Sequence, residues 1–395
     1  MIQIEELKQF KQKRQFVPKN FKVTSWPSLK CFFDRLLDAE FESKGSFENW
    51  MKQWSELEGI IDEDLAWRYI KMTTDTTNEH YENSYSDFIE NIDPEYQKSC
   101  NAIFKKISTS PVPININTKD YTVYLRNVRS SIEIFEEKNI PLNTKEQLLE
   151  KEYGEIAGGM VVIYNDQEYT MPQAANFLKK TDRSIRKGVW LLMNERRHND
   201  KDKLDDLLTD LIGLRHNISI NAGFENYRDY KFKALKRFDY DHKDCLLFHE
   251  SCKTLVIPLI EQLNEYRKEK LGINELFPWD LSIDIEGKEA LRSFEKENTF
   301  MDKAIACFNE IDPFFGSCLS TMRNLGYLDL FSRKGKAPGG YNYPLNEIGV
   351  PFIFMNAAGS IDDITTLVHE GGHAIHSFLT RDIPIVPFRG APMEV

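Results

Sequence analysis

One stretch of the sequence carries most of the information about fold and chemistry: Thr365-Thr366-Leu367-Val368-His369-Glu370-Gly371-Gly372-His373-Ala374-Ile375-His376. It contains an HExxH motif, in which His369 and His373 are four residues apart. On a helix this spacing places both imidazoles on one face, where they can share one zinc ion. Glu370 then lies about 100° round the helix, beside such an ion. There its carboxylate can take a proton from zinc-bound water and pass it to a leaving amine.

The residues around the motif predict an amphipathic helix. Ser360 and Asp363 form a start that resembles a capping box. One face is apolar, consisting of Ile364, Leu367, Val368, Ala374, Ile375, Phe378 and Leu379. The opposite stripe holds Asp362, Thr365, Thr366, His369, His373 and His376. We therefore expect the apolar face to rest on a core and the histidines to face a cleft or solvent, with Gly372 leaving room beside them. The alternative is a surface helix whose histidines have no function.

Helical periodicity also dominates the rest of the chain and predicts a mainly α protein. Ser25-Trp26-Pro27-Ser28 is typical of a helix start, and it precedes Leu29, Phe32, Phe33, Leu36 and Leu37. Further helical patterns cover residues 46–72, 117–137, 144–157, 171–220 and 241–270.

Strand signals are few. Residues 160–164 and 168–170 flank Asn165-Asp166 and predict a β-hairpin. Residues 326–331 and 350–356 predict a short sheet near the HExxH helix. The second strand is expected to be buried or at an edge, and Pro351 favours the edge. A polar stretch at 194–203 suggests two lobes, residues 1–195 and 196–395.

Composition excludes several classes of function. The 395 residues carry a formal net charge of −11, which argues against nucleic-acid or anionic-membrane partners. The six cysteines are dispersed without a CxxC pair, so neither a disulfide scaffold nor a cysteine zinc knuckle is expected. The N-terminal sixteen residues lack the apolar core of a secretory signal, and no apolar run is long enough to span a bilayer. We expect a protein of the reducing cytoplasm.

Two other patterns contain residue types that bind ligands. His242, Cys245, His249 and Cys252 are metal-binding types, but one continuous helix cannot wrap four ligands round a tetrahedral ion. We interpret them as ordinary helix residues. The glycine-rich loop at 335–341 does not match a phosphate-binding P-loop.

Several segments resemble the oligoendopeptidase F and thimet oligopeptidase family of zinc peptidases. They are the 365–376 stretch quoted above, Ala337-Pro338-Gly339-Gly340-Tyr341, Pro351-Phe352-Ile353-Phe354-Met355-Asn356, Pro278-Trp279-Asp280-Leu281 and Leu328-Asp329-Leu330-Phe331-Ser332-Arg333-Lys334-Gly335. The resemblance is specific over residues 278–379 and weaker back to about residue 150.

The resemblance implies a two-lobed helical metallopeptidase shell around a deep channel that admits short unfolded peptides. His369 and His373 map onto the zinc ligands, Glu370 maps onto the general base, and the implied cofactor is one Zn²⁺. The strand at 352–356 would flank the site, with a free edge that could pair with the substrate backbone.

The chain departs from the family pattern after Pro392, which resembles the first residue of the helix that carries the family's third ligand, a glutamate. That ligand is expected about one turn beyond residue 395, so the chain looks like a truncated peptidase. Glu394 is the late carboxylate that remains, at what we expect to be the frayed first turn of that helix. His376 is a further possible substitute.

Three hypotheses follow. The first is a zinc-dependent endopeptidase acting on oligopeptides, with metal-activated water as the nucleophile. The second is another HExxH peptidase, such as an aminopeptidase, for which the sequence shows no carboxylate cluster to hold a peptide amino terminus. The third is a non-catalytic truncated module with a vestigial zinc site. Because two imidazoles alone form a weak site, we expect the 395-residue chain to bind zinc loosely or not at all. Oligomeric state and cleavage preference stay open.

Overall fold

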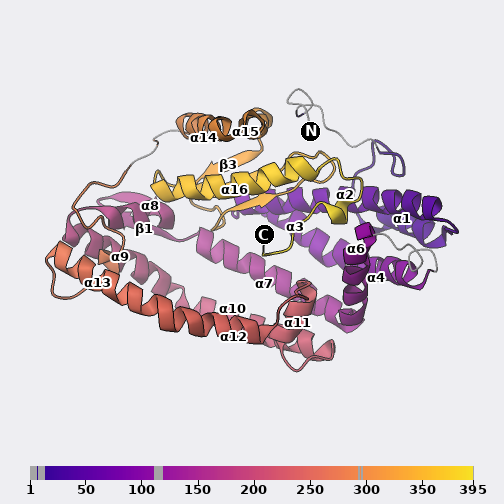
Figure 1. The fold of residues 1–395 in the computed structure, drawn as a ribbon, viewed down its shortest axis with the longest axis horizontal. Coiled ribbons are helices and arrows are strands. Elements are labelled where there is room, and N and C mark those ends of the chain that lie inside the picture. Colours follow the sequence, from indigo (N-terminus) through magenta and orange to yellow (C-terminus); the bar gives the residue numbers. More distant parts are fainter. Residues whose placement is uncertain (1–6, 8–13, 111–118, 292–293, 295–296, 395) are drawn as a thin grey trace.

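The computed structural model describes residues 7, 14–110, 119–291, 294 and 297–394, and over these ranges the chain is mainly helical (Figure 1). The predicted mainly α class is therefore confirmed. Much of the N-terminal stretch used to argue against a secretory signal, and the first two residues of the predicted 117–137 helix, lie outside the described residues.

The N-terminal half is a helical bundle packed around aromatic side chains. The first helix, α1 (Trp26–Asp38), begins at the predicted start and buries Leu29, Phe32, Phe33 and Leu36. These positions recur every three or four residues, which is why one face of the helix meets the core. The bundle continues through α2 (Lys44–Thr74), α3 (Glu79–Asp87), η2 (Phe88–Ile92), α4 (Asp93–Thr109), α6 (Lys119–Ile134) and, after the short η3 (Glu137–Asn139), α7 (Ile140–Gly158).

The predicted hairpin is present as β1 (Val161–Tyr164) and β2 (Gln167–Thr170). Its turn residues Asn165 and Asp166 both have positive φ, as expected for a two-residue turn that matches the twist of the strands. Helices then follow as α8 (Met171–Ala175), η4 (Asn176–Lys179), α9 (Arg183–Asn199), α10 (Lys201–Asn221) and α11 (Tyr227–Ala234). The polar stretch at 194–203 includes the break between α9 and α10, whereas the boundary predicted between residues 195 and 196 lies inside α9. The division into two lobes stays a prediction.

A long helical arm comprises α12 (His242–Ser251), η5 (Cys252–Val256) and α13 (Ile257–Leu271), which Figure 1 shows running along one side of the molecule. No side chain on these three segments is buried. Among the exposed apolar residues are Leu247, Leu255 and Leu263. The arm therefore lies outside the core formed by the described residues, and no helix among those residues is long and apolar enough to cross a membrane.

A three-stranded sheet lies between α2 on one side and three later helices on the other. The strands are β3 (Leu328–Phe331), β4 (Tyr341–Tyr343) and β5 (Phe352–Ala357), in the order β3-β5-β4. Alternate β5 residues face opposite layers: Phe354 packs with Ala66 and Ile70 of α2, whereas Ile353 joins the core of α14 (Glu297–Ile311), α15 (Pro313–Leu325) and α16 (Ile361–Thr380).

Of the two positions predicted for the strand at 350–356, the buried one is correct and the edge position favoured by Pro351 was wrong. The strand β5 is central, parallel to β3 and antiparallel to β4. Pro351 is compatible with this position because it precedes the first strand residue, Phe352, and so removes no hydrogen bond from the ladder. The free edge expected at 352–356 is therefore occupied by β4.

Candidate metal and catalytic site

The helix α16 starts directly after the central strand. The backbone N–H groups of Ala358, Gly359 and Ser360 donate to Oδ2 of Asp363 at 3.0, 2.8 and 2.7 Å. One carboxylate thus accepts the N–H of the N-cap residue Ser360, as in a capping box, together with two N–H groups of the turn before it. The predicted capping box is confirmed, and it fixes the first turn of α16 to the end of β5.

The buried face of α16 is narrower than predicted. Leu367, Ala374 and Phe378 are fully buried, but Val368 and Leu379 are 47% and 55% exposed, so their assignment to the core-facing side was wrong. Both residues lie at the margin of the apolar face, where the 100° period of a helix does not decide whether a side chain faces the core or solvent. Gly371 faces the core directly, and a Cβ atom there would lie 2.9 Å from Cζ of Phe308 on α14. The absence of a side chain at 371 therefore allows α14 to approach.

The two motif histidines lie side by side on the exposed face. Their Nε2 atoms are 3.2 Å apart and their rings are perpendicular. Two nitrogens bound to one tetrahedral zinc at about 2.0–2.1 Å would be roughly 3.3 Å apart. The observed separation of the two donors is therefore compatible with a shared ion.

Glu370 lies on the buried side of the same turn, with only 8% of its surface exposed. Its carboxylate is close to the glycine pair before β4, since a Cβ atom built on Gly340 would be 3.9 Å from Oε1 of Glu370. The general base assigned from the sequence is thus placed between the histidine face and the start of β4. The sequence did not indicate that Gly340 would lie beside it.

A cavity of about 590 Å³ opens at the histidines. Its walls come from α16, from β4 and the chain after it, and from the C-terminal segment that contains η7 (Val386–Phe388). Its lining includes His369, His373, His376, Asn342, Leu345, Pro351, Arg389 and Met393. Asn342 was not predicted as a site residue. Its Oδ1 atom is buried and has no hydrogen-bond partner among the described residues.

No third ligand joins the histidines within the described part of the chain, where no cluster of three or more His, Cys, Asp or Glu side chains could hold a metal ion. The Glu394 carboxylate instead accepts hydrogen bonds from Nε of Arg237 and the hydroxyl of Tyr240, at 2.8 and 2.6 Å. These bonds hold the pKa of Glu394 below its usual value.

Residues 391–394 form no helix, and the helix expected to begin at Pro392 and to continue beyond residue 395 stays a prediction. The tail before them is packed rather than frayed. Ile385 and Val386 are buried, and the Val386 N–H donates to Oγ of Ser55. His376 lines the same cavity as the motif histidines but stays only a possible substitute ligand.

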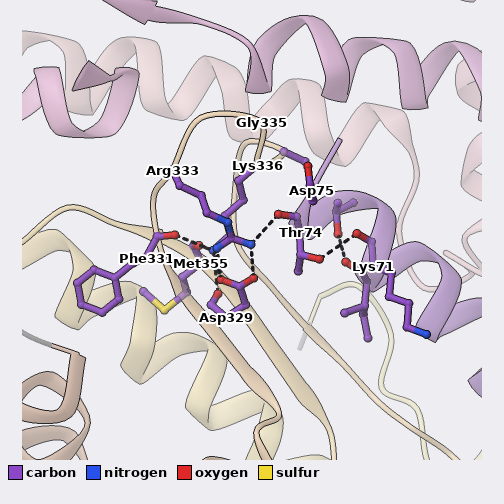
Figure 2. Close-up of polar contacts among 12 residues, drawn as sticks. Lys71, Thr74, Asp75, Asp329, Phe331, Arg333, Gly335, Lys336 and Met355 are labelled. Atoms are coloured by element: carbon purple, nitrogen blue, oxygen red, sulfur yellow. Dashed lines mark hydrogen bonds and ion pairs between the residues drawn. The ribbon is translucent and has the colours of Figure 1, made fainter. Parts of the chain in front are cut away.

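The structure also places the residues of the other two patterns. His242, Cys245 and His249 lie on α12 and Cys252 begins η5, so all four share one helical run as expected. The glycine-rich loop instead surrounds a buried lysine that the sequence did not reveal. Figure 2 shows Lys336 pointing into the loop, where its Nζ donates to the carbonyl oxygens of Asp329, Phe331 and Met355.

Comparison with known families identifies the chain. Residues 176–386, more than half of the sequence, match the model of Peptidase family M3, and residues 16–135 match the Peptidase M3 N-terminal domain. The chain belongs to peptidase family M3. The resemblance inferred from the 278–379 motifs is therefore confirmed.

Curated relatives of this M3 chain are oligopeptidases. Oligopeptidase PepF of Bacillus subtilis is 25% identical over 230 residues, which are 57% of this chain and 32% of that protein. Oligopeptidase A of Escherichia coli is 24% identical over 236 residues, covering 44% of this chain and 33% of its own length. The chain thus spans about a third of the length of these relatives.

Solved structures share the fold. A structure titled PZ peptidase A with inhibitor 2 superposes with a TM-score of 0.90 at 22% identity, covering 96% of this chain and 68% of that one. A putative oligoendopeptidase F gives the same TM-score and identity, with 97% and 68% coverage. The M3 chain therefore has the helical metallopeptidase fold of oligoendopeptidase F-like proteins.

Proposed function

We propose that this M3 chain provides the metal-binding helix of a zinc-dependent endopeptidase that hydrolyses short unfolded peptides in the cytoplasm. His369 and His373 are the proposed ligands and Glu370 is the proposed general base. The observation that carries the proposal is the 3.2 Å separation of the two Nε2 atoms beside a nearly buried carboxylate. The family membership supports the same reaction class.

Each residue has a defined part in the proposed reaction. A bound zinc ion would polarise the scissile carbonyl and acidify a water molecule. His369 and His373 orient that ion on the exposed face of α16. Glu370 accepts the proton of the attacking water and transfers it to the leaving amine, the step that requires a base within hydrogen-bond reach.

The proposed strand that pairs with the substrate backbone is β4, and not the strand at 352–356 that the sequence suggested. Because β5 is paired on both sides, the outer edge of β4 (Tyr341–Tyr343) is the strand edge that adjoins the cavity. An extended peptide can add to such an edge through its backbone. Asn342 of β4 lines the cavity that contains the two motif histidines.

The alternative is a non-catalytic module with a vestigial metal site. It is favoured by the position of Glu394, whose carboxylate is held by Arg237 and Tyr240 instead of facing the histidines. A quenched oligopeptide substrate with added zinc separates the two functions, since the vestigial module would give no turnover.

The Glu370→Gln variant tests the assigned base. We expect it to bind zinc as the wild type does, because Glu370 is not a proposed ligand, and to lose about 10²–10⁴-fold in turnover. Slow but measurable hydrolysis by the wild type is sufficient for the comparison. Near-normal turnover of the variant would refute the role of Glu370.

A further inference from the structure

The backbone next to the proposed base is confined on several sides. A Cβ atom at Gly340 would lie 3.3 Å from the carbonyl oxygen of Phe354 and 3.5 Å from Cγ2 of Thr366, in addition to its 3.9 Å approach to Oε1 of Glu370. Gly339 has a φ of +94°, a conformation that side chains other than glycine rarely adopt. The backbone of Gly339 and Gly340, which leads into β4, therefore packs closely beside Glu370 and has little room for a side chain at residue 340.

One side chain ties this segment to the central strand. The Nδ2 atom of Asn356, near the end of β5, donates to the carbonyl oxygens of Ala337 and Gly339 at 2.8 and 2.9 Å. An amide nitrogen has two hydrogens, so both are used on the same loop. Asn356 thus connects the strand that leads into α16 with the backbone that faces Glu370.

The start of the same loop is anchored independently. Arg333 and Lys336 both donate hydrogen bonds to Asp329 (Figure 2), and Arg333 also donates to the carbonyl oxygen of Thr74 at the end of α2. The Ala337 N–H bonds the carbonyl oxygen of Thr73 at 2.9 Å. These contacts hold the loop up to residue 337. Between Ala337 and the start of β4, the side-chain hydrogen bonds that hold the backbone are, among the described residues, those from Asn356 to the carbonyl oxygens of Ala337 and Gly339.

We propose that Asn356 is a positioning residue for the peptidase site. By holding the carbonyl groups of Ala337 and Gly339, it sets the gap between the Gly339–Gly340 backbone and the Glu370 carboxylate. It also aligns this backbone with the outer edge of β4, along which the substrate is proposed to run. The inference rests on the proposed function. It adds to that function a residue that touches neither metal nor substrate and acts through the loop.

The test compares Asn356→Ala with Asn176→Ala in the 395-residue chain. Asn176 is a matched control, since its Nδ2 donates to the carbonyl oxygen of Ala358 at 2.7 Å, two residues from Asn356, without contacting the glycine loop. Three quantities are measured: zinc affinity by chelator competition, amide exchange of the 337–343 segment by mass spectrometry, and hydrolysis of a quenched peptide.

We expect Asn356→Ala to leave zinc affinity unchanged, to speed amide exchange in 337–343, and to lower kcat about 10- to 100-fold with KM within a factor of three. Asn176→Ala should leave exchange in 337–343 and kcat near the wild-type values. Unchanged exchange in Asn356→Ala, or faster exchange with a normal kcat, would overturn the proposal. A wild-type chain that binds zinc but gives no turnover would refute the proposed function, while the exchange data would still decide whether Asn356 holds the loop.

A second variant distinguishes positioning from general support of the fold. In Asn356→Asp the ionised carboxylate cannot donate and faces two carbonyl oxygens, whereas the protonated acid can donate one hydrogen bond. The ratio of its kcat to that of the wild type should therefore rise as the pH falls from 8 to 5. The corresponding ratio for Asn356→Ala should not change with pH, and equal pH profiles of the two ratios would contradict the donor role.

Discussion

Replacement of Lys336 by methionine provides a quantitative test of how the sheet beside the site is held together. The ammonium group is buried, with 2% of the residue exposed, and it donates to Oδ1 and the carbonyl oxygen of Asp329 at 2.9 and 3.0 Å and to that of Phe331 at 3.1 Å. Methionine retains most of the volume but removes all of these hydrogen bonds. Removing one partner of a buried ion pair costs about 3–5 kcal/mol. Because Asp329 keeps its two bonds to Arg333, we expect about 3 kcal/mol.

The assay is urea unfolding followed by circular dichroism and tryptophan fluorescence, with Lys334→Met as the control. Lys334 is two residues away, but its side chain is 57% exposed and pairs with Glu168 at the surface, so its loss should cost less than about 1 kcal/mol. Equal unfolding midpoints for the two variants would refute the reasoning.

Acid should reduce the difference between Lys336→Met and the wild type. Burial raises the pKa of the Asp329 carboxyl, but hydrogen bonds from Arg333 and Lys336 outweigh that effect and hold the pKa below its ordinary value. Such a carboxylate contributes stability above its unfolded pKa and loses it as the pH falls through the folded value. The loss of Lys336 should therefore matter less at pH 3 than at pH 7.

Further predictions concern a buried acid and two neighbouring glycines. Burial raises the pKa of Asp62 on α2 to about 7, so the folded state holds a proton that the unfolded state releases between about pH 4 and 7, and stability should fall as the pH rises through this window. Asp62→Asn should weaken that dependence and stabilise the chain at pH 8 by at most about 4 kcal/mol, and a melting temperature with unchanged pH dependence would contradict this. Gly371→Ala should destabilise by about 1 kcal/mol, because the contact with Phe308 outweighs the gain in helix propensity. Gly372→Ala, with nothing within 4 Å of the added Cβ, should stabilise by up to about 1 kcal/mol, and the opposite order of the two melting temperatures would refute the packing argument.

The sequence predicted those features that depend on local patterns. Three such features are the two helix N-termini at Ser25 and Ser360, the turn at Asn165-Asp166, and the placement of the HExxH histidines on one helix face. Each depends on residues within a few positions of one another, and each was found as predicted. The pattern around Pro351 failed because strand order depends on where β4 returns to the sheet, which local propensity does not encode.

Long-range contacts explain what the sequence missed at the site. Asn356 and Gly340 lie 13 and 29 residues before His369, the first residue of the motif. Folding alone brings them close to the site, so no periodicity in the sequence marks them. Lys336 would ordinarily be read as a surface residue, since lysine is rarely buried without a partner. Its partners come from β3 and β5, and that arrangement appears only in three dimensions.

Zinc titration of the 395-residue chain and of the His369→Ala/His373→Ala double variant, by competition with a chromophoric chelator, tests the central claim most directly. The described residues bring together two imidazoles as ligands, so we expect the wild type to bind one zinc ion loosely. The double variant should lose that ion and keep its helical content. The fold should persist because both side chains lie on the exposed face of α16. Zinc retained at one equivalent by the double variant, or an unchanged affinity, would contradict the assignment of the metal site to this helix.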